Sequence, residues 1–182
     1  MRRLLFVLLL MCAPFAMAQE SLSVCGVELG SDIESAENIL KARFGEYGVH
    51  RDGMQRLSMY DRVIGGSEFS HIEYDFGCTV IGGRAYTYLS SILLSKNFSS
   101  YESAKSYYDN WAKKLDKKYV YDYTNKEQTN GKEDVTRYYY NPKGEGLVLV
   151  SIFYYQSKGG DYFWYVNVFY WEPSLINDTN DY

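Results

Sequence analysis

One short segment of the chain places a histidine and two carboxylates at alternate positions. Within Phe69–Cys78, the residues His71, Glu73 and Asp75 alternate with larger, mostly apolar residues. A period of two predicts a half-buried strand, so the three polar side chains share one face, about 7 Å apart along it. A histidine and two carboxylates could bind a divalent cation or exchange protons with a substrate, which makes them a weak candidate metal or hydrolase site. The alternative is the solvated face of a half-exposed strand, because side chains in line along a strand rarely converge on one ion.

The common catalytic motifs are absent from the rest of the sequence. There is no G-x-S-x-G, no S-x-x-K and no H-E-x-x-H pattern. With only His50 and His71, the chain cannot supply a three-histidine metal site. Paired glycines lie between predicted strands, where they favour hairpin turns rather than phosphate-binding loops. We therefore expect a protein that is not an enzyme and needs no cofactor, with a small periplasmic hydrolase or metal-dependent enzyme as the alternative.

A second set of candidate residues is aromatic. The sequence contains 20 Tyr, 9 Phe and 3 Trp, and both faces of the predicted strand Tyr162–Trp171 carry rings. If helices cover one face of the sheet, the other face exposes part of this set, and exposed Tyr and Trp dominate protein interfaces. The predicted binding surface contains Tyr138, Tyr140, Tyr154, Trp164, Tyr165 and Trp171.

Three interpretations of these rings remain open. A protein partner is favoured over a glycan, although the apolar faces of sugars also stack on aromatic rings. The third interpretation is that the rings pack edge to face within a curved sheet and only shield it from water. Alanine substitutions at Trp164, Tyr165 and Trp171 that separate loss of binding from loss of stability would distinguish a binding surface from a core.

Two segments that must position these strands begin in the same way. Ser31 and Ser99 each precede a glutamate by three residues, and an amphipathic stretch follows each one. This spacing is a capping box, in which serine and glutamate bind the free N–H groups of the first turn, so we expect helices that begin near Ser31 and Ser99. Predicted strands follow at about Tyr60–Ile64, Phe69–Cys78 and Arg84–Leu94, and then at Tyr119–Tyr123, Val135–Asn141, Leu147–Gln156 and Tyr162–Trp171.

This order of elements predicts the fold class. Each half contains one helix followed by an antiparallel meander, and each helix has one apolar stripe to bury. Joining two such meanders edge to edge removes an exposed edge from each of them. We therefore predict an α+β fold in which two helix-plus-antiparallel-meander repeats form one sheet with both helices on one face.

The first eighteen residues indicate export. Arg2 and Arg3 precede the apolar run Leu4–Leu10, and Ala16–Ala18 is typical of a signal-peptidase site. The apolar run is shorter than the roughly 20 residues that a membrane-spanning helix needs. We expect a periplasmic or secreted protein divided into a signal peptide over 1–18, a first repeat over 19–98, a second repeat over 99–173 and a disordered tail over 174–182.

Cleavage after Ala18 leaves two cysteines, Cys25 and Cys78. In an oxidising compartment an even pair favours a disulfide, which closes a long loop and stabilises the fold by roughly 4 kcal/mol. Two buried free thiols are the alternative. The third cysteine, Cys12, follows Met11, and a residue as large as methionine argues against lipid attachment there.

The charge of the mature chain limits its partners. The signal peptide holds two of the 19 basic residues and none of the 23 acidic ones, so the mature chain has a net charge of −6. Nucleic-acid binding needs a clustered basic face, and anionic membranes attract basic segments, so neither partner is expected. The expected partner is a protein or a glycan, with no membrane insertion after signal cleavage.

The first repeat also resembles a known fold family. The stretch Cys25–Ser31, the amphipathic helix after it and the stop at Phe44 and Gly45 resemble exported bacterial proteins with the β-lactamase-inhibitor-protein-like and outer-membrane-assembly-lipoprotein-like fold. The tyrosine-rich sequence is most similar to exported proteins of the Bacteroides group. The resemblance implies helices on one face of an antiparallel sheet and a second face free to receive a partner. The chain departs from the pattern in having one helix per half where inhibitor repeats have a pair, and in lacking a clear lipid-attachment cysteine.

Overall fold

The structure is a computed structural model that describes residues 22–129, 131–142, 146–157 and 160–171. The predicted signal peptide and the predicted C-terminal tail lie outside the described residues. The elements, in chain order, are β1 (Ser23–Val24), β2 (Val27–Glu28), α2 (Ile33–Phe44), the 3-10 helix η1 (Glu46–Gly48), β3 (His50–Asp52), β4 (Arg56–Ile64), β5 (Ser67–Ile81), β6 (Arg84–Phe98), α3 (Tyr101–Leu115), β7 (Val120–Thr129), β8 (Lys132–Tyr140), β9 (Leu147–Gln156) and β10 (Tyr162–Trp171).

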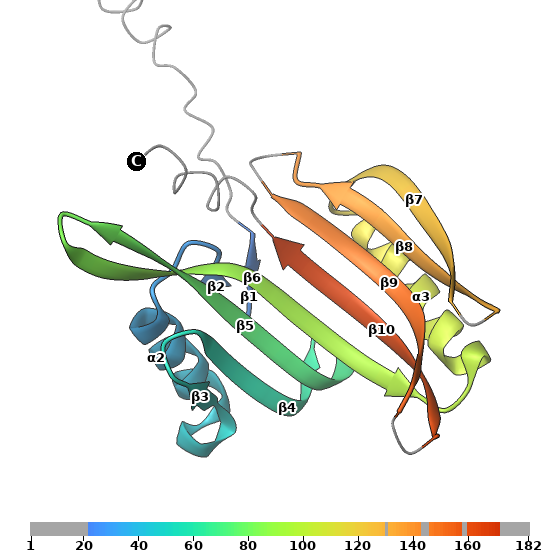
Figure 1. Cartoon of the computed structure of the whole chain (residues 1–182), viewed down its shortest axis with the longest axis horizontal. Coiled ribbons are helices and arrows are strands. Elements are labelled where there is room, and N and C mark those ends of the chain that lie inside the picture. Colours follow the sequence, from blue (N-terminus) through green and yellow to red (C-terminus); the bar gives the residue numbers. More distant parts are fainter. Residues whose placement is uncertain (1–21, 130, 143–145, 158–159, 172–182) are drawn as a thin grey trace, which may run out of the picture.

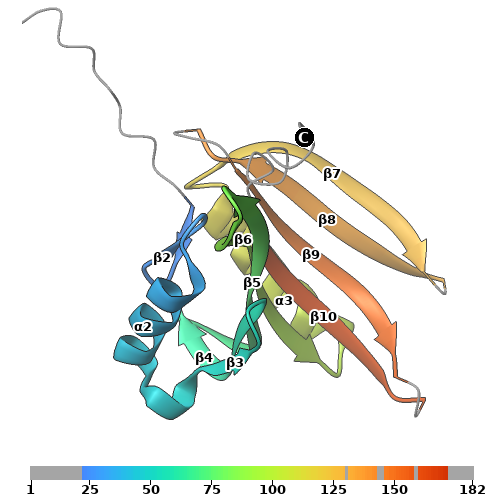
Figure 2. The ribbon, with the colours of Figure 1, turned by 60° about the vertical axis from the view of Figure 1, so that its left-hand side comes forward.

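Eight of these strands form one antiparallel sheet in the order β3-β4-β5-β6-β10-β9-β8-β7 (Figure 1). Each helix is followed by a four-strand meander, and the two meanders join where β6 pairs with β10. The short strand β3 and the longer strand β7 form the two outer edges (Figure 2). The predicted α+β class with a single continuous sheet is confirmed, and the origin of the two halves as a sequence repeat stays a prediction.

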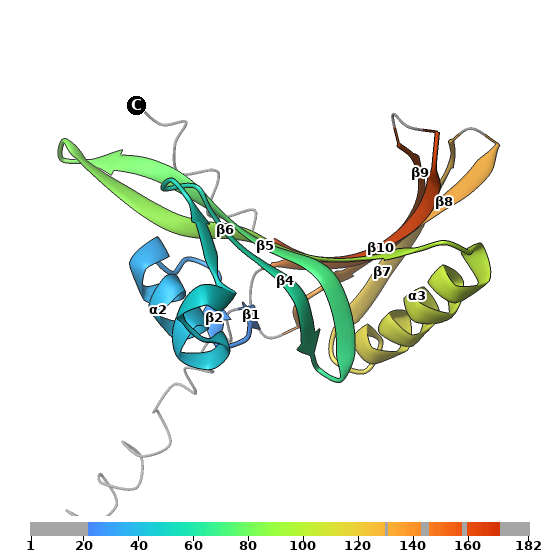
Figure 3. The same ribbon diagram turned by 90° about the horizontal axis from the view of Figure 1, so that it is seen from below.

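Both helices lie on the same side of the sheet (Figure 3). Helix α2 buries Ile33, Ala36 and Leu40 and contacts β4 and β6, whereas α3 contacts β6, β9 and β10. The buried residues of α3 are larger, and two of them, Tyr108 and Trp111, are aromatic. The small β1–β2 hairpin contacts α2 and lies on this side as well. The predicted placement of both helices on one face is therefore confirmed.

The helices begin one residue later than the capping boxes predict. In α2 the cap is Asp32, whose carboxylate accepts a hydrogen bond from the Ser35 N–H at 2.9 Å. In α3 the cap is Ser100, whose hydroxyl accepts from the Ser103 N–H at 3.3 Å. Ser31 cannot serve as the α2 cap, because its carbonyl accepts from the Leu89 N–H at 2.8 Å, which holds it extended beside β6.

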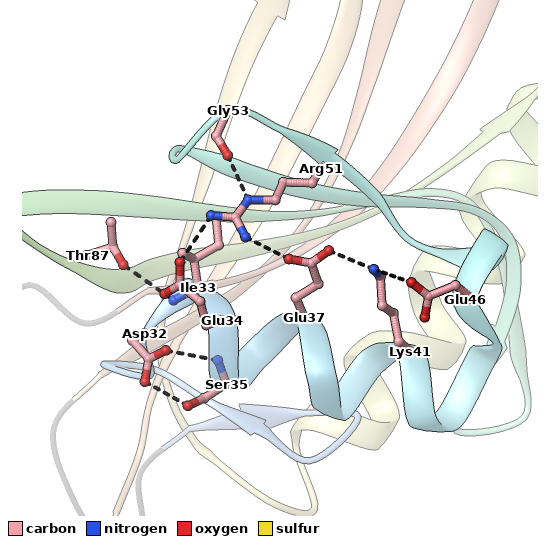
Figure 4. A network of polar contacts seen from close by, with 10 residues as sticks. All are labelled: Asp32, Ile33, Glu34, Ser35, Glu37, Lys41, Glu46, Arg51, Gly53 and Thr87. Atoms are coloured by element: carbon pink, nitrogen blue, oxygen red, sulfur yellow. Dashed lines mark hydrogen bonds and ion pairs between the residues drawn. The ribbon is translucent and has the colours of Figure 1, made fainter.

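A network of charged side chains joins α2 to the strand that follows it (Figure 4). Arg51 of β3 donates to Glu37 at 2.8 Å and to Glu34 at 3.2 Å. Lys41 continues the network, with its ammonium 3.0 Å from Glu37 and 2.7 Å from Glu46. Glu34 therefore pairs with β3 instead of binding the start of its own helix, and the network fixes α2 against the outer edge of the sheet.

The predicted disulfide between Cys25 and Cys78 is not formed. Both cysteines are free thiols and do not lie at disulfide distance. Cys25 occupies the turn between β1 and β2 beside the buried Tyr74, whereas Cys78 is exposed four residues farther along β5, which is about 13 Å of extended chain. The sequence showed that β5 reaches residue 78 but did not show where along β5 the β1–β2 turn packs.

Candidate functional site

The strand β10 shows how the two faces of the sheet differ. Trp164, Val166 and Val168 are buried on the side of the helices, and the Tyr101 ring of α3 lies 4.7 Å from the Trp164 ring. The alternate residues of β10 point to the other side and are only partly buried. Within the described part of the chain no helix covers that side (Figure 3), and we call it the free face.

Neighbouring strands extend this alternation into a continuous aromatic surface. Directly opposed residues of antiparallel strands point to the same face, so the register identifies the free-face residues of β8, β9 and β10. We call the aromatic and apolar ones the aromatic patch: Tyr138, Tyr140, Leu147, Leu149, Phe153, Tyr155, Phe163, Tyr165, Phe169 and Trp171. None of the ten is charged, and neither β9 nor β10 contains a charged residue.

The rings of the aromatic patch support one another across the strands. Phe153 and Tyr165 stack with centroids 5.5 Å apart and ring planes 12° apart, and Tyr155 meets the Tyr165 ring edge on at 6.0 Å. At the outer edge Tyr123 of β7 stacks on Tyr138 at 4.4 Å, and burial raises the pKa of the Tyr138 hydroxyl. Tyr155 nevertheless stays 48% exposed, so the patch offers ring surface to solvent.

A row of polar side chains crosses the free face from one half of the sheet to the other. Each member is the directly opposed partner of the next: Tyr60, His71, Ser95, Asn167, Ser151, Thr136 and Asn125. We call this the polar row. At its centre the side-chain oxygen of Asn167 is buried and accepts no hydrogen bond from any described residue. An amide oxygen without a partner, placed among aromatic rings, can accept from a ligand that carries donors.

The predicted cluster of His71, Glu73 and Asp75 lies on the free face of the first half, as the alternation predicts. Its carboxylates are occupied by a neighbouring strand, because Arg56 of β4 donates to Asp75 at 2.7 Å and lies 3.6 Å from Glu73. His71 Nε2 lies 3.3 Å from Glu73 Oε1 without forming a hydrogen bond, and the Tyr60 ring stacks on the imidazole at 4.7 Å. Among the described residues, no group of three or more histidines, cysteines and carboxylates is arranged to hold a metal ion. The cluster therefore has the contacts of an ion-paired strand surface.

The six residues predicted as one binding surface lie on two faces. Tyr138, Tyr140, Tyr165 and Trp171 belong to the aromatic patch. Tyr154 and Trp164 point to the side of the helices, where their rings contact each other at 5.0 Å. The alternation of each strand was readable from the sequence, but which of the two faces α3 covers was not.

Some residues of the free face cannot be identified from the sequence alone. The leucines of the patch, the ring of Tyr123 and the polar row become visible only when the strand register is known. Two surface hollows of about 250 and 330 Å³ are lined by other residues, the first beside Arg62 and Lys96 and the second beside Tyr101 and Lys132. The aromatic patch is thus an open surface rather than part of either hollow.

Comparison with protein-family models, with curated proteins and with solved structures gave no match. The resemblance to exported proteins of the inhibitor-like fold therefore stays a prediction. Neither helix of the described chain has the length and apolar composition that crossing a membrane requires.

Proposed function

We propose that the chain is an exported binding protein that receives a protein partner on the aromatic patch and acts without catalysis. The observation that supports this is a group of three neighbouring strands whose free face carries ten uncharged aromatic or apolar side chains, crossed by the polar row. An exposed surface of this kind on an exported protein costs solubility unless something binds it. Export is supported by the basic, apolar and small-residue pattern of the first eighteen residues.

The chemistry of the patch defines the partner. A surface without formal charge attracts by burial of apolar area, so the partner presents apolar or aromatic side chains, and the affinity changes little with salt. In Figure 3 the hairpin of β5 and β6 on one side and the ends of β8 and β9 on the other rise away from the helices, which places the free face between them. A convex loop or helix of a folded protein fits such a surface better than a flat one does.

The experiment uses the mature protein as immobilised bait in an envelope extract of its own cells. The two patch variants are Tyr165→Ala and Trp171→Ala, and the matched control is Tyr60→Ala. Tyr60 is also a tyrosine of the free face, half exposed and stacked on a ring, but it lies in the first half. We expect each patch variant to capture at least about tenfold less partner than the wild type, as central aromatic anchors do. The control should capture as much as the wild type, and all three should melt within a few degrees of it.

Two outcomes would contradict the proposal. Equal capture by all variants would remove the aromatic patch from the binding reaction. Capture that survives protease treatment of the extract but is lost after periodate oxidation would identify a glycan, for which the unpaired Asn167 oxygen beside the rings supplies the hydrogen-bond acceptor. A salt series adds a further check, because binding that disappears at high salt would not come from an uncharged surface.

A further inference from the structure

One part of the sheet projects beyond its neighbours. Toward the turn between β5 and β6, the pairing of β5 with β4 ends at Asp75, and the pairing of β6 with β10 ends at Ser91. Residues 77–88 therefore form a two-stranded arm whose backbones pair only with each other (Figure 1), while at its base Leu89 bonds to Gly30 and Ser31. A β-bulge between Asp75 and Phe76 marks its base. Two-stranded ribbons are at best marginally stable in water, so a long one that projects from a sheet gains by contacting another surface.

The arm carries its own aromatic side. Tyr88 lies over Gly77 on the opposite strand, so closely that a Cβ atom at position 77 would lie 2.5 Å from the ring. Tyr86 follows two residues along on the same side and is 48% exposed. By the alternation of the strands this is the side of the free face, and Figure 3 shows the arm rising away from the helices. Arg84 is the single charged residue among residues 77–88.

From these observations we infer that a second copy of the chain occupies the aromatic patch, and that its contact element is the arm. This rests on the proposed function, since it names one occupant of the same surface. A twofold axis lying across the free face brings the arm of each copy over the second half of the other. The contact is then reciprocal and closes as a dimer rather than extending as a fibre. A protein partner and a second copy compete for the aromatic patch. The dimer is therefore the form in which the patch is covered when no partner is bound.

Charge and area both favour this occupant. The aromatic patch is uncharged and the arm nearly so, which means that neither surface repels its own copy. Three strands about 4.8 Å apart and ten residues of about 3.3 Å long give the patch a flat footprint of about 470 Å². The five-residue strands of the arm add about 160 Å² on the same basis. Side chains make the real surface larger than this flat footprint. The area buried by each copy therefore approaches the ~800 Å² per partner that is typical of a stable interface.

The first test measures self-association of the purified mature chain by sedimentation velocity, at concentrations from about 1 to 100 µM. We expect a dimer that both Tyr86→Lys on the arm and Tyr165→Lys on the patch weaken at least about tenfold, because each buries a charge in an apolar contact. The control is Tyr47→Lys, which changes a tyrosine that is 95% exposed and lies outside both surfaces. The control should dimerise as the wild type does.

The second test locates the contact. The label is placed on the free-face side of the arm by Thr79→Cys in a Cys78→Ser background, because Thr79 directly opposes Tyr86, whereas Cys78 opposes Thr87 on the side of the helices. Cys25 is partly buried and burial raises the pKa of its thiol, so a photo-crosslinker attaches selectively at position 79. Mixing the labelled chain with an isotope-marked copy separates cross-links between copies from those within one. We expect cross-links between copies to fall in β9 and β10.

The outcomes separate this inference from the function on which it rests. A wild-type chain that stays monomeric throughout the concentration series overturns the dimer, and so does a dimer that neither lysine variant weakens. Cross-links between copies that fall outside β8, β9 and β10 overturn the arm contact. None of these results affects the capture experiment, which uses dilute bait and measures the amount of another protein that is captured. The proposed binding function can therefore be supported or contradicted independently of the dimer.

Discussion

The two halves of the sheet have the same elements in the same order but very different free faces. In the first half the free face carries Arg56 paired with Asp75 and a histidine stacked under Tyr60. In the second half it carries stacked rings and leucines without a single charge on β9 or β10. The covered faces, in contrast, are apolar in both halves. The free face of the first half is therefore covered by paired charges, and that of the second half by uncharged rings and leucines.

The difference also reaches the covered face. Helix α2 is fixed mainly by aliphatic packing and by the charged network around Arg51 and Glu37. Helix α3 is fixed by rings, since Phe69 lies 5.4 Å from Trp111 and Lys114 lies 4.7 Å above the same indole. The second half thus depends on buried tyrosine and tryptophan, and this dependence can be measured.

The largest expected effect is loss of the fold at alkaline pH, driven by the second half. Burial raises the pKa of Tyr107 and of Tyr108 to about 12 and moves those of Tyr139 and Tyr170 farther upward, whereas the first half contributes Tyr74. The pKa of an unfolded tyrosine is about 10. A folded-state pKa above the unfolded value gives stability that is complete below pH 10 and is lost as the pH rises from 10 through 12.

Tyrosinate absorbance and far-ultraviolet circular dichroism, followed together from pH 8 to 12.5, check this expectation. The buried tyrosines should ionise only as the circular dichroism signal falls. If all twenty tyrosines ionise near pH 10 while the fold remains intact, the second half does not depend on its buried hydroxyls.

The next largest effect compares two adjacent residues of β10. Trp164 is 8% exposed and packs against Tyr101 and Tyr154, so Trp164→Ala should lower the free energy of unfolding by about 3 to 5 kcal/mol. Tyr165 points to the free face, and Tyr165→Ala should cost only about 1 kcal/mol. Urea denaturation of both variants measures the difference. Equal losses would mean that the free face is as much a core as the covered face is.

The two positions also show how much of the fold and of the binding surface could be predicted from the sequence. The period-two pattern of Tyr162–Trp171 gave both faces correctly, and the helix–meander order gave the fold class. Which face of the strand is covered depends on the side of the sheet to which the chain returns after β6, and no local pattern encodes that. Tyr154 and Trp164 were therefore assigned to the binding surface although they pack toward α3.

Other features could not be predicted from the sequence because they depend on contacts between segments that are far apart in the chain. The alternating pattern of the sequence predicts strand β5. Its extension past the β1–β2 turn depends on pairing with β6, and this extension separates Cys78 from Cys25. The polar row and the patch leucines likewise depend on register, because a residue gains its neighbours only when strands are aligned. Charge pairing of Arg56 with Asp75 joins positions 19 residues apart and could not be derived from either strand alone.

A smaller effect compares the fully buried tyrosines of the two halves. The Tyr139 hydroxyl donates to the Asp116 carboxylate at 3.2 Å, and Asp116 is also paired with Arg137 at 3.1 Å. The Tyr74 hydroxyl donates to the Val24 carbonyl at 3.4 Å. Hydrogen bonds to charged groups are stronger, so Tyr139→Phe should cost about 2 kcal/mol and Tyr74→Phe about 1 kcal/mol. Thermal and urea unfolding of the pair measure this, and a larger loss at Tyr74 would reverse the contrast between the halves.

The smallest effect concerns the helix starts, which the halves share. Asp32→Ala and Ser100→Ala each remove a cap and should cost about 1 kcal/mol at pH 7, whereas Ser31→Ala and Ser99→Ala should change the free energy of unfolding by less than about 0.5 kcal/mol. If Ser31→Ala and Ser99→Ala lowered the free energy of unfolding more than the cap variants do, the predicted capping boxes would be correct.

Acid pH separates the two caps. Hydrogen bonds from Ser35 lower the pKa of the Asp32 carboxyl below its usual value of 3.8. A lowered folded-state pKa gives stability that is present above the unfolded pKa and lost as the pH falls through the folded one. The cost of Asp32→Ala should therefore shrink below about pH 4, while the cost of Ser100→Ala stays constant because a hydroxyl does not ionise there. Parallel unfolding curves at pH 7 and pH 3 measure both, and a cost of Asp32→Ala that does not change with pH would show that its carboxylate is not what caps α2.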